Sequence, residues 1–192
     1  MHWHKTLIKY LLFFMLLPGG NLTGQRIPTN RLISKELLQE TVLFLSQDSL
    51  QGRLTGSRGA DIAAAFIAAS FDSIGLQPRT GFDGYFDHFT ADFNRKKIPA
   101  KNVVAAIPGN ITNDTMVIFS AHYDHIGKGN DLPYNKDYTY QDDIFNGAND
   151  NATGVAALLE LARYYKSQKN NRYLLLFIAF SGEEMEMLGS AH

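Results

Sequence analysis

The sequence predicts an α/β fold in which a sheet is covered by helices on both faces. Three segments read "KNVVAAIPG", "DTMVIFSAHYDH" and "RYLLLFIAFSGEE", and each contains a nearly continuous apolar run. Such runs are typical of strands that are buried on both faces. The segment "DNATGVAALLELARYYKSQ" lies between the second and third runs and has the apolar spacing of a long helix. Strands that are separated by a helix in this way indicate an α/β sheet.

Each of the three expected helices has an apolar face that we predict to be buried. The first helix starts near a capping residue, Ser34, and should bury Leu37, Leu38, Val42 and Leu45. The second helix ends at Gly75 and Pro78, and its apolar face is expected to consist of Ile62, Phe66, Ala69 and Phe71. The long helix should bury Val155, Leu158, Leu159 and Ala162. An additional strand is expected in "YFDHFTADF".

Composition limits the classes of protein and of site. A chain of 192 residues with 45% hydrophobic residues can form one domain with a sizeable core. Its net charge of −1 gives no broad basic surface for nucleic acid. Because the chain has no cysteine, it can form neither disulfides nor thiolate metal sites. Any metal ion must therefore be bound by histidine, aspartate and glutamate.

The first 24 residues are interpreted as a signal peptide. Lys5 and Lys9 precede an apolar run over residues 10–17, which Pro18 and two glycines interrupt. A membrane-spanning helix needs about 20 apolar residues, and this run is much shorter. The alternative is a short membrane anchor. We expect cleavage near Gly24, a secreted or periplasmic protein without a stable membrane anchor, and a catalytic domain that begins at residue 25.

The chemically suggestive residues follow the predicted strands. His122 and Asp124 follow one strand, Glu183 and Glu184 follow another, and Asp150 precedes the long helix. In open α/β sheets, ligands bind outside the carboxyl ends of the strands. We therefore expect these side chains to meet at one edge, beneath a polar loop over residues 127–149.

The spacing of His122 and Asp124 suits a metal ligand and its partner. Residues two apart in an extended segment share a face, so both side chains can point the same way. A metal-bound imidazole usually donates its other N–H group to a carboxylate. The alternative is a histidine that is hydrogen-bonded for structural reasons only. The neighbouring His125 is expected to point away from the site.

Asp150 lies among small residues and asparagines in "NGANDNATG". The two oxygens of its carboxylate can bridge two cations, and the glycines on either side permit close approach of the backbone. The alternative is that Asp150 caps the N-terminus of the long helix.

Glu183 and Glu184 are adjacent where a buried strand ends. In a turn from strand to helix, both carboxylates can face one site. One could bind a metal ion while the other accepts a proton from water whose pKa the metal has lowered to about 7. The alternative is that acidic residues merely stabilise a helix N-terminus.

Taken in order, "SAHYDHIG", "NGANDNATGVAALLELAR" and "FIAFSGEEMEMLGSAH" resemble the metallo-aminopeptidases of peptidase family M28. The upstream run "LQGRLTGSRGADIAAAFIAASFDSIGLQP" is also similar to the stretch that precedes the catalytic domain of these enzymes. The resemblance covers roughly residues 36–192. It implies a three-layer, zinc exopeptidase-like sandwich with a mixed, mostly parallel sheet, and a pair of zinc ions that hydrolyse a peptide substrate.

The resemblance also implies a role for each residue. His122 would bind one zinc ion, Asp150 would bridge both, and Glu184 would bind the other. Glu183 would be the general base, and Asp124 would orient His122. A cis peptide bond is expected after Asp150.

Family members have two further ligands, an aspartate and a histidine, downstream of the paired glutamates. The sequence ends at His192 before either appears. We therefore expect a secreted di-zinc aminopeptidase that is represented here by its N-terminal part and is inactive in this form. The alternative is a non-catalytic relative that folds partly and binds metal weakly. Carboxypeptidase and glutaminyl cyclase activities, the side-chain preference and the oligomeric state stay open.

Overall fold

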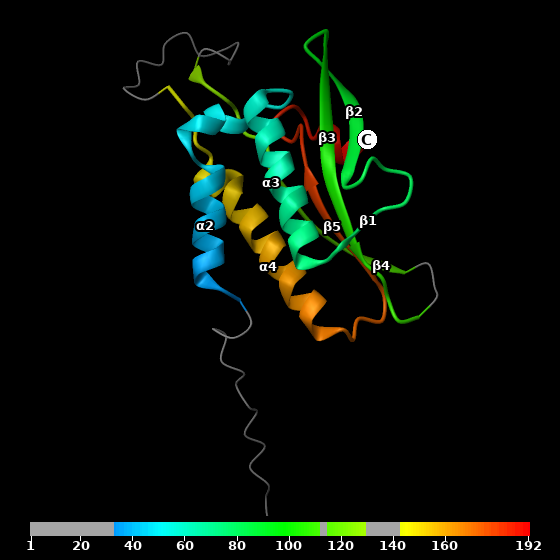
Figure 1. Cartoon of the computed structure of the whole chain (residues 1–192). Helices are drawn as coiled ribbons and strands as arrows, with labels where there is room; N and C mark the ends of the chain where they lie inside the picture. The colour runs from blue at the N-terminus through cyan, green and yellow to red at the C-terminus, as the bar shows by residue number, and fades with distance from the viewer. Residues whose placement is uncertain (1–32, 112–114, 130–142) are drawn as a thin grey trace, which may run out of the picture. The chain divides into compact units, whose positions relative to one another are not determined.

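A five-stranded mixed sheet organises the computed structural model, which describes residues 33–111, 115–129 and 143–192 (Figure 1). The expected signal peptide, residues 1–24, lies outside the described residues. The strands are β1 (Gln77–Pro78), β2 (Phe86–Phe93), β3 (Lys96–Ile107), β4 (Met116–His122) and β5 (Leu174–Phe180). Their order is β1-β3-β5-β4, and β2 pairs with β3. No helix in the described ranges has the length and apolar character to cross a bilayer.

The predicted α/β class with a mixed sheet is confirmed, but the strand directions differ from the expected majority. β4 and β5 are parallel, whereas β3 is antiparallel to β1, β2 and β5. Part of the difference comes from a hairpin that the sequence analysis missed. Asn94 and Arg95 join β2 to β3 with φ angles of 52° and 63°. Two consecutive residues with positive φ are typical of a tight hairpin turn. For this reason β3 begins at Lys96, before the apolar run.

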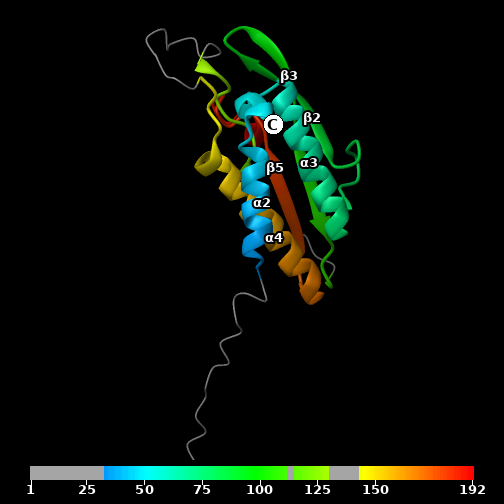
Figure 2. The ribbon, with the colours of Figure 1, turned by 60° about the vertical axis from the view of Figure 1, so that its left-hand side comes forward.

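Three helices lie on one side of the sheet (Figures 1 and 2). They are α2 (Lys35–Leu45), α3 (Arg58–Ile74) and α4 (Thr153–Gln168). Ser34 caps α2 by accepting a hydrogen bond from the N–H group of Leu37, as predicted. Gly75 ends α3 with a φ of 83°. Short helical turns are η2 (Asp48–Arg53), η4 (Ala148–Ala152) and α5 (Leu188–Ala191).

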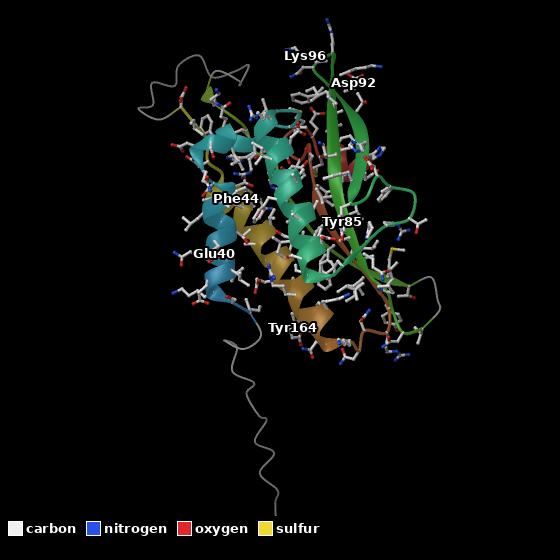
Figure 3. All side chains as sticks on the ribbon, viewed as in Figure 1. Glu40, Phe44, Tyr85, Asp92, Lys96 and Tyr164 are labelled. Atoms are coloured by element: carbon white, nitrogen blue, oxygen red, sulfur yellow. The ribbon has the colours of Figure 1, made fainter. Side chains whose placement is uncertain are left out.

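The core lies between this helical layer and the sheet. The predicted inward residues of α4 are all buried: Val155, Leu158, Leu159 and Ala162. The prediction for α3 was wrong at Ile62 and Ala69, which are exposed. The face of α3 that packs in the core is instead Ala60, Ala63, Ala64, Ile67, Ala68 and Phe71. Because alanines occur all around α3, six in its 17 residues, hydrophobicity alone could not decide its orientation. At the α2–α3 contact, Phe44, labelled in Figure 3, stacks on Phe66 with 4.3 Å between ring centroids.

The prediction that β4 is buried on both faces was wrong. In the described residues β4 is the last strand of the sheet, and Ile118 is 53% exposed. β5 instead lies between β3 and β4, and its central residues are buried. The sheet face opposite the helices forms a cavity of about 280 Å³, lined in part by Phe82, Leu176 and His192. Within the described part of the chain, the expected helical cover is therefore present on one face only, apart from the short α5.

Candidate metal centre

The predicted site residues converge at the edge where β4 and β5 end. The two strands are parallel, and His122 at the end of β4 pairs with Phe180 at the end of β5. The turn after β5 carries Glu183 and Glu184, and η4, just before α4, carries Asp150. Parallel strands place their carboxyl ends at the same edge, which explains why residues some 60 positions apart meet here.

His122, Asp150 and Glu184 form a group that could hold a metal ion. One potential ligand atom from each residue lies within 4.8 Å of the others. His122 Nε2 lies 3.1 Å from Asp150 Oδ1 and 3.8 Å from Glu183 Oε2. Imidazole nitrogen and carboxylate oxygen are ligands that zinc accepts. The structure thus brings the three predicted ligands together, and their binding of zinc stays a prediction.

The ring of His122 is oriented for binding through Nε2. Its Nδ1 lies 3.2 Å from the backbone oxygen of Asp124 and 3.6 Å from Asp124 Oδ1. When Nδ1 carries the ring proton and donates a hydrogen bond to the backbone oxygen of Asp124, the lone pair of Nε2 faces the site. Burial lowers the pKa of His122, but the hydrogen bond and charge of Asp124 and the charge of Glu183 outweigh burial and raise the pKa to about 9. A cation that binds Nε2 must therefore displace a proton at neutral pH.

Asp124 contacts more than His122, whose Nδ1 lies closer to the Asp124 backbone oxygen than to the carboxylate that was predicted to orient the ring. Its carboxylate is fully buried and accepts a hydrogen bond from the Thr55 hydroxyl at 2.7 Å. It also accepts the backbone N–H groups of Glu183 and Glu184, at 3.3 and 3.4 Å. Asp124 thereby fixes the turn that carries both glutamates.

Asp150 does not cap α4, so the structure decides against that alternative. Its backbone is non-helical, with φ of −123° and ψ of 95°, and the peptide bond to Asn151 is cis, as predicted. The side-chain oxygen of Asn151, and not that of Asp150, accepts the N–H group of Gly154 in the first turn of α4, at 3.1 Å. The carboxylate of Asp150 is 63% exposed and is free of the capping role.

The expectation that His125 points away from the site was wrong. His125 Nδ1 lies 2.7 Å from Glu184 Oε1, and the His125 side chain is only 13% exposed. The prediction extended the alternation of a strand beyond His122, where β4 ends. Sequence alternation holds only while the backbone stays extended in the sheet.

Two further residues, Arg53 and Thr55, escaped the sequence analysis. Arg53 is completely buried, and its guanidinium donates to backbone oxygens near the site. Thr55 is 3% exposed and bonds Asp124. The signal that could have drawn notice is "GRLTG", in which an arginine lies between turn-forming glycines without a nearby acidic partner.

Comparison with known proteins agrees with this geometry. Residues 102–192 match the sequence model of Peptidase family M28. Aminopeptidase YwaD of Bacillus subtilis is 36% identical over 85 residues, which cover 44% of this chain and 15% of the relative. The Alkaline phosphatase isozyme conversion protein of Escherichia coli is 31% identical over 144 residues, which cover 72% of this chain and 40% of the relative. A probable zinc metalloprotease of Pyricularia oryzae is 29% identical over 163 residues, which cover 82% of this chain and 30% of the relative.

Solved structures share the fold. A glutaminyl cyclase of Porphyromonas gingivalis matches with a TM-score of 0.63 and 22% identity, over 83% of this chain and 54% of the other. A Zn-dependent exopeptidase of Parabacteroides distasonis matches with a TM-score of 0.58 and 20% identity, over 77% of this chain and 46% of the other.

The matched part of the chain spans less than half the length of each of these curated relatives. The agreement in motif order and clustered ligand types leads to one conclusion: residues 102–192 carry the sequence of peptidase family M28, in a chain that has a zinc exopeptidase-like fold.

Proposed function

We propose that the protein is a secreted di-zinc metallo-exopeptidase that hydrolyses N-terminal peptide bonds. The observation that carries the proposal is the convergence of His122, Asp150 and Glu184, with Glu183 beside them. The name of the Bacillus subtilis relative, an aminopeptidase, supports cleavage at the N-terminus. Relatives named zinc metalloproteases support zinc as the metal.

The described residues divide the tasks of such a site. His122 and Asp150 would hold one zinc ion, and Asp150 and Glu184 the other. Bound zinc would supply Lewis-acid chemistry, lowering the pKa of water toward about 7 and polarising the carbonyl of the substrate.

Glu183 is proposed as the general base. Its side chain is 42% exposed, and Oε2 lies 3.8 Å from His122 Nε2, so the carboxylate borders the site and can reach water. It would accept a proton from the attacking water and donate it to the leaving amine. Asp124 touches no reacting atom and acts by holding His122 and the backbone of the paired glutamates.

Secretion forms part of the proposal and rests on the sequence of residues 1–24 alone. The basic residues, the short apolar run and the small residues after it support cleavage near Gly24. N-terminal sequencing of the protein from its own organism tests this directly. A mature protein that begins at Met1, and is found inside the cell, would contradict it.

The decisive test of activity uses the protein as its organism makes it, so that every residue it carries in the cell is present. We expect about two zinc ions per chain and hydrolysis of aminoacyl p-nitroanilides that a chelator abolishes and zinc restores. A substrate blocked by N-acetylation should not be cleaved. Cyclisation of N-terminal glutamine without hydrolysis would replace the aminopeptidase proposal, and a zinc-free, inactive protein would favour the non-catalytic alternative.

A further inference from the structure

The segment Gly52-Arg53-Leu54-Thr55 contacts all three parts of the chain that carry the proposed ligands. Its first two residues are the end of η2, and it lies some 50 residues upstream of the part that matches the family model. The contacts are made by the side chains of Arg53 and Thr55 and by the backbone of the segment.

Arg53 joins the end of β4 to the loop before η4. Its Nε donates to the backbone oxygen of Tyr123 at 2.8 Å, Nη1 donates to the oxygen of Asn146 at 2.7 Å, and Nη2 donates to that of Gly147 at 3.0 Å. Nη1 also contacts the backbone oxygen of Leu45. A buried guanidinium is tolerated when its donors find partners, and here four backbone carbonyls accept from it. Two separate segments are thereby held by one planar group.

These two segments carry ligands. Tyr123 lies between His122 and Asp124, and Gly147 lies three residues before Asp150. A shift of the guanidinium would therefore change the distance between His122 and Asp150, which is now 3.1 Å between Nε2 and Oδ1. The side chain acts on the ligands through the backbone.

Thr55 joins Asp124 to the turn that carries the glutamates. Its hydroxyl donates to Asp124 Oδ2 at 2.7 Å and accepts the N–H group of Gly182 at 3.1 Å. The same carboxylate accepts the N–H groups of Glu183 and Glu184. Without the hydroxyl, Asp124 and Gly182 would each lose a buried hydrogen-bond partner.

The backbone of the segment reinforces these contacts. Gln51, Gly52 and Arg53 all have positive φ, at 48°, 68° and 47°. Left-handed residues other than glycine are uncommon and persist where surrounding contacts enforce them. The oxygen of Gly52 accepts the N–H group of Gly127 at 3.0 Å, and that of Arg53 accepts the N–H group of His125 at 3.2 Å.

We propose that Arg53 and Thr55 are positioning residues of the metal centre. Arg53 sets the separation of His122 and Asp150, and Thr55 sets the direction of Asp124 and of the turn with Glu184. The inference rests on the metal centre proposed above. Residues that hydrogen-bond to metal ligands without touching the metal typically lower metal affinity about 10- to 100-fold when they are replaced.

The first test uses Thr55→Val, which keeps the shape of the side chain and removes the hydroxyl, beside Thr55→Ser, which restores it. Co²⁺ replaces zinc as the probe, because its visible absorption reports ligand geometry. We expect Thr55→Val to weaken Co²⁺ binding about tenfold or more and to alter the spectrum at saturating Co²⁺. Thr55→Ser should bind as the unmodified protein does.

Tyr85→Phe is the matched control for loss of a hydroxyl. Tyr85 is labelled in Figure 3, and its hydroxyl donates to the backbone oxygen of Leu76, just after the C-terminal end of α3. None of the proposed ligands is a partner of this hydroxyl. The Tyr85→Phe variant should therefore have the same Co²⁺ spectrum as the unmodified protein. If Thr55→Val gives the unmodified spectrum and affinity, Thr55 is a fold residue only and its positioning role is refuted.

The second test uses Arg53→Lys. Lysine keeps the positive charge but lacks the planar guanidinium that joins the end of β4 to the loop before η4. We expect a folded protein, judged by circular dichroism, with weaker Co²⁺ binding and an altered spectrum. Unchanged binding, or failure to fold, would each remove Arg53 from the proposal. If the unmodified protein binds no Co²⁺ or Zn²⁺ at all, the proposed function fails first, which separates the two failures.

Discussion

The two adjacent glutamates have different surroundings, and this difference predicts different effects of mutation. Glu184 is 20% exposed and paired with His125, whereas Glu183 is 42% exposed and borders His122. We expect Glu183→Gln to keep both zinc ions and to lower kcat about 10²- to 10⁴-fold, because only a proton acceptor is lost. Glu184→Gln should release about one zinc ion. Metal analysis beside turnover measures both, and loss of zinc from Glu183→Gln would mean that the two roles are reversed.

A second prediction at this scale concerns His122 in the metal-free protein. The pKa of His122 is raised from 6.5 to about 9 in the fold, by Asp124 and Glu183 against the effect of burial. Protonation of His122 therefore stabilises the fold. The stabilisation is complete below pH 6.5 and is lost as pH rises through 9, by at most ~3 kcal/mol. Urea unfolding in the presence of a chelator should show this loss.

His122→Gln should remove that part of the pH dependence. His88→Gln, which replaces a half-exposed histidine of β2, serves as the control and should keep it. An equal pH dependence in His122→Gln and in the unmodified protein would contradict the prediction.

At the scale of elements, the loop that leads into η4 is packed too tightly for a side chain at Gly147. Its φ is 60°, and a Cβ atom there would lie 2.5 Å from the oxygen of Asp150 and 2.6 Å from Cδ2 of His125. Gly147→Ala should lower the free energy of unfolding by about 2–4 kcal/mol and weaken metal binding, since strain and overpacking add. Urea unfolding and Co²⁺ titration measure the two effects.

Gly84→Ala is a close control, because Gly84 also has a φ of 60° but has open space where a Cβ atom would be. The Gly84→Ala substitution should lower the free energy of unfolding by about 1 kcal/mol, because only the backbone conformation is strained, and it should leave the metal affinity unchanged. Equal losses in both variants would mean that the packing around Gly147 contributes nothing.

At the scale of the whole molecule, the number of ligands predicts weak metal binding by residues 25–192 expressed alone. In the proposed two-zinc site, the described residues would offer His122 and Asp150 to one ion, and Asp150 and Glu184 to the other. A catalytic zinc ion usually has three protein ligands. We expect less than one tightly held zinc ion per chain and no hydrolysis of aminoacyl p-nitroanilides. Chelator-sensitive hydrolysis by this segment would show that a further ligand, such as His125, completes the site.

The exposed strand β4 predicts poor solubility for the same segment. Met116, Val117 and Ile118 are 42%, 38% and 53% exposed on the last described strand of the sheet. Apolar edge strands favour association between molecules. Ile118→Lys should raise the soluble yield and reduce light scattering, whereas Leu43→Lys, at an exposed leucine of α2 outside the sheet, should do so less.

Local sequence patterns were enough to predict the α/β class, the buried strand β5, the long helix α4 and the identity of the proposed ligands. These features depend on local apolar patterns and on motifs whose residue types are chemically distinctive. The sequence also indicated that His122, Asp150 and Glu184 would meet, because strand ends converge at one edge of a sheet.

The edge strand, the buried face of α3 and the direction of His125 became known from the folded structure alone. These properties depend on neighbours distant in sequence, and a short apolar run looks the same at the centre or at the edge of a sheet. The same holds for Arg53, whose partners are backbone oxygens of Leu45, Tyr123, Asn146 and Gly147. Since every residue has a backbone oxygen, no sequence pattern could identify these partners, and only the folded chain brings them around one guanidinium.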